Sequence, residues 1–177
     1  MSSGRPRASS REALSDAACE LFLERGFEAT SVTEIAARAG VSRSSFFNYF
    51  DSKDAILWAA LDRRIDRLVA ASPAADPLAS LHELGRDFEP DSLALALVNA
   101  DAMGLRDELE RAAAVRQSRI GRAVAASFVH RGDDPVSAAI AGAAHAGAVM
   151  IAIERWALAG AGRSPLPAPR PAPASRA

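Results

Sequence analysis

Alanine accounts for 41 of the 177 residues, and this excess constrains the fold more than any other feature. Alanine is the strongest helix former, because its side chain loses no rotamer freedom in a helix. Runs of valine, isoleucine and aromatic residues bounded by turn residues, which mark strands, are nearly absent. With 49% hydrophobic and 24% charged residues, the chain can bury a sizeable core. We therefore predict an all-α fold.

The few reactive side chains limit the chemistry that the chain can perform. Cys19 is the single cysteine, so no intramolecular disulfide and no cysteine-based zinc finger can form. His82 and His130 have no partners at metal-ligand spacing, and we expect neither a metal site nor a cofactor. No basic segment followed by an apolar run opens the sequence, so the expected compartment is the cytoplasm.

The net charge of −1 hides an uneven distribution of charge. Residues 1–11, 35–50 and 161–177 contain arginines and no acidic residue, so the rest of the chain is acidic. Basic segments on an acidic body suit a local contact with a polyanion. Basic chain ends that arise by chance are the alternative interpretation.

Composition divides the chain into four parts. Residues 1–9 are small and polar and predict a disordered basic arm. Residues 161–177 carry five prolines at alternate positions and predict a disordered Pro-rich tail. Between them lie two folded parts, at 10–52 and 53–160.

Apolar residues at helical spacing and capping signals predict eight helices. Gly26, Gly40 and Gly132 are expected to end helices, and Ser31 with Glu34 forms a capping box. Asp134 followed by Pro135 opens the last helix. The helices are expected around Leu14–Phe22, after Ser31, at 43–49, after Ser52, at 78–88, near 91–103, at 105–131 and at 135–159.

The last predicted helix has no ionised group from Pro135 to Ile153. That length approaches the ~20 residues of a membrane span, but alanine and glycine make the helix only weakly hydrophobic. Ala139, Ala143 and Gly147 are spaced by four and let another helix approach closely. We interpret this helix as part of an intersubunit pair and not a membrane span, with an intramolecular core as the alternative.

Residues 31–49 have the spacing of a helix-turn-helix, with a tight turn at 39–41. Phe46 and Phe50 can anchor the second helix to a core. The opposite face then carries short polar side chains and one arginine, which suit base edges and phosphates in a major groove. That solvent face comprises Arg43, Ser44, Ser45 and Asn48, while Ser31, Thr33 and Lys53 lie at or near helix N-termini that attract phosphate.

The stretch from Arg11 to Leu61 resembles the DNA-binding domain of the TetR family of bacterial regulators. The resemblance implies a three-helix DNA-binding head at 10–52, a fourth connecting helix, and a helical body at 53–160 that binds a ligand and forms the dimer. The shared positions are Ala17-Ala18, Leu21-Phe22, Gly26-Phe27, Thr30-Ser31-Val32, Ile35-Ala36, Ala39-Gly40-Val41-Ser42, Tyr49-Phe50 and Ser52-Lys53.

The resemblance also implies which side chains face double-stranded DNA. Lys53, the only lysine, stands where the family places a phosphate-binding lysine. Phe47 stands where the family usually has tyrosine, so a hydroxyl contact to phosphate is either lost or supplied by Tyr49. The run from Phe46 to Lys53 is similar to regulators of the mycofactocin system, some of which respond to acyl-CoA. The DNA-binding candidates are Thr33, Arg43, Ser44, Ser45, Asn48, Tyr49 and Lys53.

The implied function is a homodimeric regulator, a repressor that a small apolar or acyl ligand, such as an acyl-CoA, releases from a palindromic operator. Arg106, Arg111 and Arg116 offer cations for the phosphates of such a ligand. Ordinary core packing is the alternative for each pocket candidate, and for His145 a bond from the ring to a backbone carbonyl. The ligand-binding candidates are Trp58, Leu61, Leu81, Phe88, Asn99, Met103, Phe128 and His145.

Three other functions remain open at this point. An enzyme has little support, because the sequence contains no Gly-rich phosphate loop, no His-Glu-x-x-His and no Cys–His pair with a plausible partner. A DNA-binding dimer without an effector would have a filled body. An interaction module would use its helix-turn-helix to contact protein, and sequence-selective DNA binding would exclude it.

Overall fold

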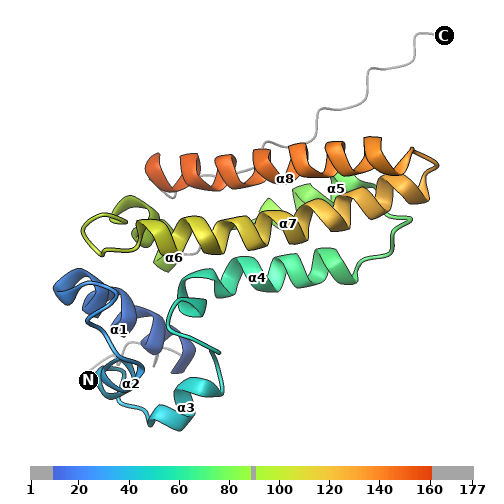
Figure 1. Cartoon of the computed structure of the whole chain (residues 1–177). Helices are drawn as coiled ribbons and strands as arrows, with labels where there is room; N and C mark the ends of the chain where they lie inside the picture. Colours follow the sequence, from blue (N-terminus) through green and yellow to red (C-terminus); the bar gives the residue numbers. More distant parts are fainter. Residues whose placement is uncertain (1–9, 89–90, 161–177) are drawn as a thin grey trace, which may run out of the picture. The chain divides into compact units, whose positions relative to one another are not determined.

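The computed structural model describes residues 10–88 and 91–160, and within them all regular structure is helical (Figure 1). This confirms the predicted all-α fold. The predicted arm at 1–9 and tail at 161–177 lie outside the described residues. The helices are α1 (Ser10–Arg25), α2 (Val32–Arg38), α3 (Arg43–Phe47), α4 (Ala55–Ala70), α5 (Pro77–Gly85), α6 (Asp91–Val98), α7 (Arg106–His130) and α8 (Pro135–Leu158).

The first helix ends follow the capping signals in the sequence. Gly26 after α1 and Gly40 after α2 take left-handed conformations with φ of +84° and +70°. Other residues rarely adopt this region, because a Cβ clashes with the neighbouring carbonyl. The capping box before α2 is also present: the Glu34 amide donates to Ser31 Oγ at 3.2 Å, and the Ser31 amide donates to the Glu34 carboxylate at 2.9 Å.

Three helices are shorter than predicted. α3 stops because the Asn48 amide donates to the Ser45 carbonyl, three residues back, and tightens the last turn. α5 stops before Asp87, which adopts a φ of +48° that is incompatible with a helix. The observed ends of α3, α5 and α6 are Phe47, Gly85 and Val98, in place of the predicted 49, 88 and 103.

The chain forms two compact units, and α4 and α7 each continue from one unit into the other. The first unit lies within 10–61 and 91–112, and the second within 62–88 and 113–160. In the first unit the ring of Phe27 packs on Phe22, with ring centroids 5.1 Å apart, as its position after Gly26 predicts. The Phe27 amide donates to the Met103 carbonyl at 2.7 Å, which ties the turn after α1 to the segment between α6 and α7.

In the second unit α7 lies between α4 and α8 (Figure 1). Arg116 on α7 donates two hydrogen bonds to the carboxylate of Asp62 on α4, at 2.9 and 2.6 Å. Both side chains are largely shielded from water, so this bidentate pair fixes the register of the two helices more firmly than an exposed pair would. On the other side of α7, the backbones of Gly121 and Gly142 meet at the contact with α8.

α8 begins as predicted, with the Asp134 carboxylate accepting hydrogen bonds from the amides of Val136 and Ser137. By length and apolar composition alone, α8 would be able to cross a membrane, a property that a buried helix of a globular protein shares. One face is buried within the second unit. The buried residues of that face are Ala138, Gly142, Ala146, Val149, Ile153, Trp156 and Ala157.

Candidate nucleic-acid interface

The turn between α2 and α3 is built to present the outer face of α3. Phe46 is fully buried, and its ring lies 5.7 Å from that of Phe50, so the two rings anchor α3 to the core as predicted. Ser42 caps the helix, with its hydroxyl accepting from the Ser45 amide at 3.0 Å. These contacts fix the position of α3, and with it the positions of the side chains on its exposed face.

Arg43 and Phe47 form a stacked pair on the exposed face of α3. The guanidinium carbon of Arg43 lies 5.2 Å from the centre of the Phe47 ring, and 45% of Phe47 is exposed. Arg43 makes no ion pair with any residue that the structure describes. Its charge is therefore available for a phosphate or a guanine edge.

The remaining polar candidates surround this pair. The hydroxyls of Ser44 and Ser45 each lie 2.8 Å from Ser42 Oγ, which sets their orientation. Asn48 and Thr33 are exposed, whereas Ser45 is half-buried. The structure thus brings Arg43, Ser44, Ser45 and Asn48 together on one short helix, and Thr33 lies on the neighbouring α2.

Tyr49 follows α3 and lies beside Arg11, a cation outside the predicted set of DNA-binding residues. The guanidinium carbon of Arg11 is 5.7 Å from the centre of the Tyr49 ring and 4.8 Å from that of Phe50. Arg11 belongs to the basic segment at 1–11, but a charge run alone does not show which of its members lies beside α3. Arg11 therefore packs over the faces of two rings at the end of α3.

Lys53 has a structural role in addition to the predicted contact with DNA. Its ammonium donates to the carbonyl oxygens of Phe27 at 2.7 Å and Thr30 at 3.2 Å, and it lies 4.0 Å from the centre of the Phe27 ring. Lys53 therefore closes the turn between α1 and α2. An ammonium has three donors, so one N–H remains for a phosphate.

Ion pairs remove much of the apparent positive charge of this domain. Arg38 donates to both carboxylate oxygens of Glu24, at 2.8 and 3.0 Å, and to Glu20 at 3.1 Å. The hydrogen bond from Arg38 lowers the pKa of the Glu24 carboxyl, and the bonds to Glu24 and Glu20 raise the pKa of Arg38. Of the two arginines in the acid-free segment 35–50, only Arg43 is thus without a carboxylate partner among the described residues.

The ligand-binding candidates are divided between the two units. Trp58, Asn99 and Met103 belong to the first unit, and Phe88, Phe128 and His145 belong to the second. Trp58, Phe88 and Met103 are buried, as core residues would be. The additional candidates Leu61 and Leu81 are also buried.

The polar ligand candidates Asn99 and His145 each bond to a backbone carbonyl four residues earlier. Asn99 donates to the Leu95 carbonyl at 2.9 Å. His145 Nδ1 lies 2.7 Å from the Ala141 carbonyl, the backbone bond that the core interpretation of this histidine predicts. The cations expected for acyl-CoA phosphates are paired as well: Arg106 with Asp101, Arg111 with Glu108 and Arg116 with Asp62.

The described residues contain no cluster of metal ligands, and their cysteine is not activated. No group of three or more His, Cys, Asp or Glu there is placed to hold a metal ion. Cys19 is buried, and burial, with the nearby charges of Asp16 and Glu20, raises the pKa of its thiol to about 12. A thiol with this pKa is not a nucleophile at neutral pH.

Residues 14–60 match the sequence profile described as bacterial regulatory proteins of the tetR family. This span covers the helix-turn-helix and the residues around it. Residues 14–60 therefore form a TetR-family domain. The predicted resemblance is confirmed, and the enzyme alternative is set aside because the TetR relatives are transcriptional regulators.

Two TetR-family relatives show how far the similarity extends. The transcriptional activator FasR of Mycolicibacterium smegmatis is 43% identical over 65 residues, which cover 37% of this chain and 30% of FasR. The protein named mycofactocin biosynthesis transcriptional regulator MftR, from Mycobacterium tuberculosis, is 40% identical over 65 residues, covering 37% of this chain and 33% of MftR. The chain spans about a third of the length of the curated relatives it matches.

The similarity of the whole fold extends further than that of the sequence. The crystal structure of NalD from Pseudomonas aeruginosa, described as the secondary repressor of a multidrug efflux pump, is 24% identical. It covers 88% of both chains with a TM-score of 0.51. This likeness confirms the fold that the TetR assignment implies, a helix-turn-helix head followed by a helical body.

Proposed function

We propose that the protein is a homodimeric transcriptional regulator that reads double-stranded DNA with α3. The observation that carries this proposal is the fixed polar face of α3, with Arg43 unpaired among the described residues and Asn48 exposed beside it. These groups suit direct readout in a major groove, while Thr33, Tyr49 and Lys53 would contact the phosphates that position the domain. A protein of this kind works where the chromosome lies, so we place it in the cytoplasm.

An outward apolar stripe on α8 supports the dimer. Val136, Ile140, Ile151 and Leu158 are between 58% and 67% exposed, and their spacing places them on one side of the helix. Only 28% of the most apolar stretch of α8 is buried within this chain. Beside α8, small residues of α7 and α8, among them Ala125 and Ala143, line a shallow hollow of about 400 Å³. Exposed apolar surface next to small residues is what a second copy of α7 and α8 would cover.

A dimer would place two copies of α3 in successive major grooves, about 34–36 Å apart, on a pseudo-palindromic operator. We propose a repressor, although the relatives include an activator as well as repressors. A small apolar or acyl effector, such as an acyl-CoA, would release the DNA. It would do so by binding more tightly to a conformation of the dimer in which the spacing of the two heads does not fit the operator. The internal hydrogen bonds of Asn99 and His145 favour the alternative, a DNA-binding dimer without an effector.

DNA binding is tested by titrating a duplex that carries the upstream region of the protein's own gene. We expect Arg43→Ala and Asn48→Ala each to weaken specific binding by about 1–3 kcal/mol while the protein stays folded. Arg25→Ala is the matched control, because Arg25 lies in the same domain and already pairs with Glu34 at 2.8 Å. If the first two variants bind like the Arg25 variant, α3 does not read this DNA.

The dimer is tested by sedimentation at micromolar concentration. Ile140→Arg would place a charge in the outward stripe of α8 and is expected to yield monomers. Val69→Arg introduces the same charge at a valine of α4 that is 53% exposed, and should leave the dimer intact. A monomeric wild-type protein would reject the interface.

A further inference from the structure

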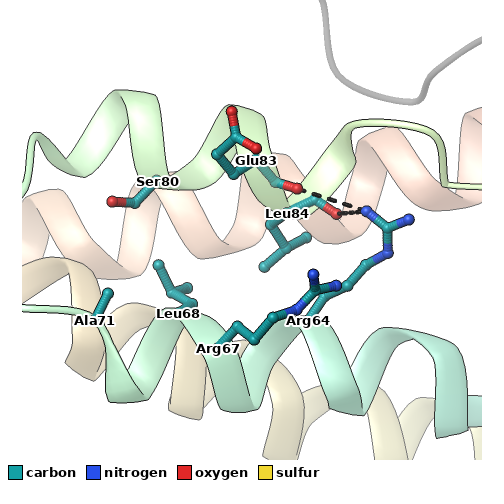
Figure 2. Close-up of a pocket in the computed structure, with 7 residues that line it drawn as sticks. All are labelled: Arg64, Arg67, Leu68, Ala71, Ser80, Glu83 and Leu84. Atoms are coloured by element: carbon teal, nitrogen blue, oxygen red, sulfur yellow. Dashed lines mark hydrogen bonds between the residues drawn. The ribbon is translucent and has the colours of Figure 1, made fainter.

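A hollow of about 260 Å³ lies between α4 and α5 of the second unit (Figure 2). Leu68 and Ala71 of α4 and Leu84 of α5 provide its apolar surface. Arg64 and Arg67 approach it from α4, and Ser80 and Glu83 lie on the α5 side. None of these residues belongs to the predicted ligand-binding set.

Arg64 has a fixed position at one end of the hollow. Its guanidinium donates to the carbonyl oxygen of Leu84 at 3.1 Å and to that of Asp87 at 2.7 Å. These carbonyls lie at and beyond the C-terminus of α5, where helix groups lack partners in the helix itself. The Arg64 guanidinium also lies 5.3 Å from the centre of the Phe88 ring. Arg64 therefore holds the end of α5 against α4, and it also contributes positive charge to the hollow.

Arg67 is the cation that remains available. It makes no ion pair with any residue described in the structure, and its Nε makes only a long hydrogen bond of 3.4 Å to the Arg63 carbonyl. The nearby carboxylates of α4 are engaged by α7: Asp62 with Arg116, and Asp66 with Arg119. Burial first, and then the positive charge of Arg67, lowers the pKa of Arg64, while the charge of Asp87 opposes this shift.

Glu83 is the one carboxylate that lines the hollow, and it is already paired. It lies 2.5 Å from Arg86, the residue that follows α5. Arg86 thus partly neutralises the Glu83 carboxylate, which weakens its attraction for Arg67. An anion in the hollow would meet the unpaired guanidinium of Arg67 on the α4 side and the hydroxyl of Ser80 on the α5 side.

We propose that this hollow binds a small organic anion, with a carboxylate or phosphate head held by Arg67 and an apolar part against Leu68, Ala71 and Leu84. Guanidinium groups bind both kinds of head through charge-assisted hydrogen bonds. The hollow measures about 260 Å³ and is open to solvent on one side. That suits a head group with a short chain and not a whole acyl-CoA.

This site would act on the helix that both units share. α4 begins in the first unit and ends in the second, so a ligand that joins α4 to α5 contacts a helix continuous with the DNA-binding domain. The binding step depends on the hollow alone, whereas its regulatory meaning rests on the function proposed above. The site also gives an anionic effector a cation that Arg106, Arg111 and Arg116 do not offer, since all three are paired.

The test uses the full chain without DNA, titrated with hexanoate, hexyl phosphate and the neutral amide hexanamide. Binding is followed through the arginine Nε–H signals in heteronuclear NMR spectra. We expect at least one of the two anions to shift the Arg67 signal saturably. Hexanamide has the same chain without the charge. Its affinity should be lower than that of the anions by about tenfold or more. The tighter of the two anions identifies the head group.

Three variants locate the site. Arg67→Ala should weaken anion binding about tenfold, whereas Arg63→Ala, an exposed arginine of the same helix that does not line the hollow, should change it little. Glu83→Gln removes the carboxylate from the hollow and frees Arg86, so it should tighten binding. Tighter binding cannot result from a folding defect, which keeps the test decisive even if Arg67→Ala proves unstable.

Some results would overturn the proposal. These are equal binding of hexanamide and the anions, equal effects of the Arg67 and Arg63 variants, or no saturable shift. The proposed DNA function is tested separately, by the duplex titration. If the protein binds the anions but not DNA, the proposed DNA function is rejected and the anion site is retained. If it binds DNA but not the anions, the anion site is rejected and the DNA function is retained.

Discussion

The backbones of Gly121 on α7 and Gly142 on α8 meet so closely that there is no room for a side chain at position 142. A Cβ built on Gly142 would overlap the carbonyl oxygen of Gly121 and would lie 3.1 Å from both the Cβ and the amide nitrogen of Ala125. A Cβ built on Gly121 would meet only ordinary contacts, 3.4 Å from the Gly142 carbonyl oxygen. The contact is therefore asymmetric, although both partners are glycines.

This asymmetry predicts unequal sensitivities to substitution at the two glycines. Gly142→Ala should destabilise the second unit by about 1–3 kcal/mol, because the overlapping atoms are backbone and the helices must separate. Gly121→Ala is the matched control and should stay within about 1 kcal/mol of the wild type, because improved helix propensity offsets its tighter contact. Urea unfolding followed by circular dichroism measures both, and equal losses would contradict the geometry.

The capping box of α2 predicts an acid-sensitive contribution to stability. The pKa of Glu34 is lowered, first by the hydrogen bond from the Ser31 amide and then by the Ser31 hydroxyl. A carboxyl whose pKa is lower in the folded state stabilises the fold above its unfolded pKa, and this contribution is lost as the pH falls through the folded pKa. Glu34→Gln should therefore be less stable than the wild type at pH 7, and the difference should shrink below the ordinary glutamate range.

The measurement is urea unfolding of both proteins at several pH values between neutrality and the acid limit of the fold. Glu154→Gln serves as the control, because Glu154 is exposed and makes no hydrogen bond or ion pair with the described residues. The difference in free energy of unfolding between Glu154→Gln and the wild type should not vary with pH. A constant difference for Glu34→Gln would show that the capping box is not the source of acid sensitivity.

Local signals in the sequence predicted most of the fold. Gly26, the Ser31–Glu34 box and the Asp134 cap act within a few residues of themselves, so their roles can be predicted without tertiary structure. The exposed face of α3 was predictable for the same reason, since Phe46 and Phe50 fix which side points inward. A misplaced helix end can involve a distant group, although the early end of α3 follows from a local bond. α5 is the clearest case, because Arg64 of α4 binds the carbonyls at its end.

Ligand-binding candidates are harder to predict than helix ends, because an apolar residue type does not distinguish core from pocket. Buried Trp58 and Phe88 fall in different units. The charge that matters at the α4–α5 hollow is also invisible in sequence. Arg64, Arg67 and Arg116 look alike until the structure shows which of them is paired.

Lys53 combines a structural role with a predicted phosphate contact, and two variants separate them. Lys53→Ala should weaken DNA binding evenly across sequences and reduce the slope of log K against log salt by about one unit. It should also lower the stability of the first unit, because the carbonyls of Phe27 and Thr30 lose their donor.

Thr30→Val is the control for the structural part. The Thr30 hydroxyl donates to the Gly26 carbonyl at 2.8 Å in the same turn and carries no charge, so its loss should lower stability by about 1 kcal/mol without changing the salt slope. Binding is measured over a range of salt concentrations at which all three proteins are folded. A slope for Lys53→Ala equal to that of the wild type would restrict Lys53 to its structural role.

The exposed ring of Phe47 leads to the last prediction, which concerns the hydroxyl that this chain lacks. Phe47→Tyr adds a phenol hydroxyl to a ring that is 45% exposed, so the fold should be unaffected. If α3 lies in the major groove, the hydroxyl reaches a phosphate and tightens DNA binding by about tenfold. If Tyr49 already makes that contact, Tyr49→Phe should weaken the wild type by a similar factor, and Phe47→Tyr should gain little. Duplex titrations of the two single variants and the double variant distinguish these cases. No effect from either change would place both rings away from the phosphates and would contradict this docking of α3.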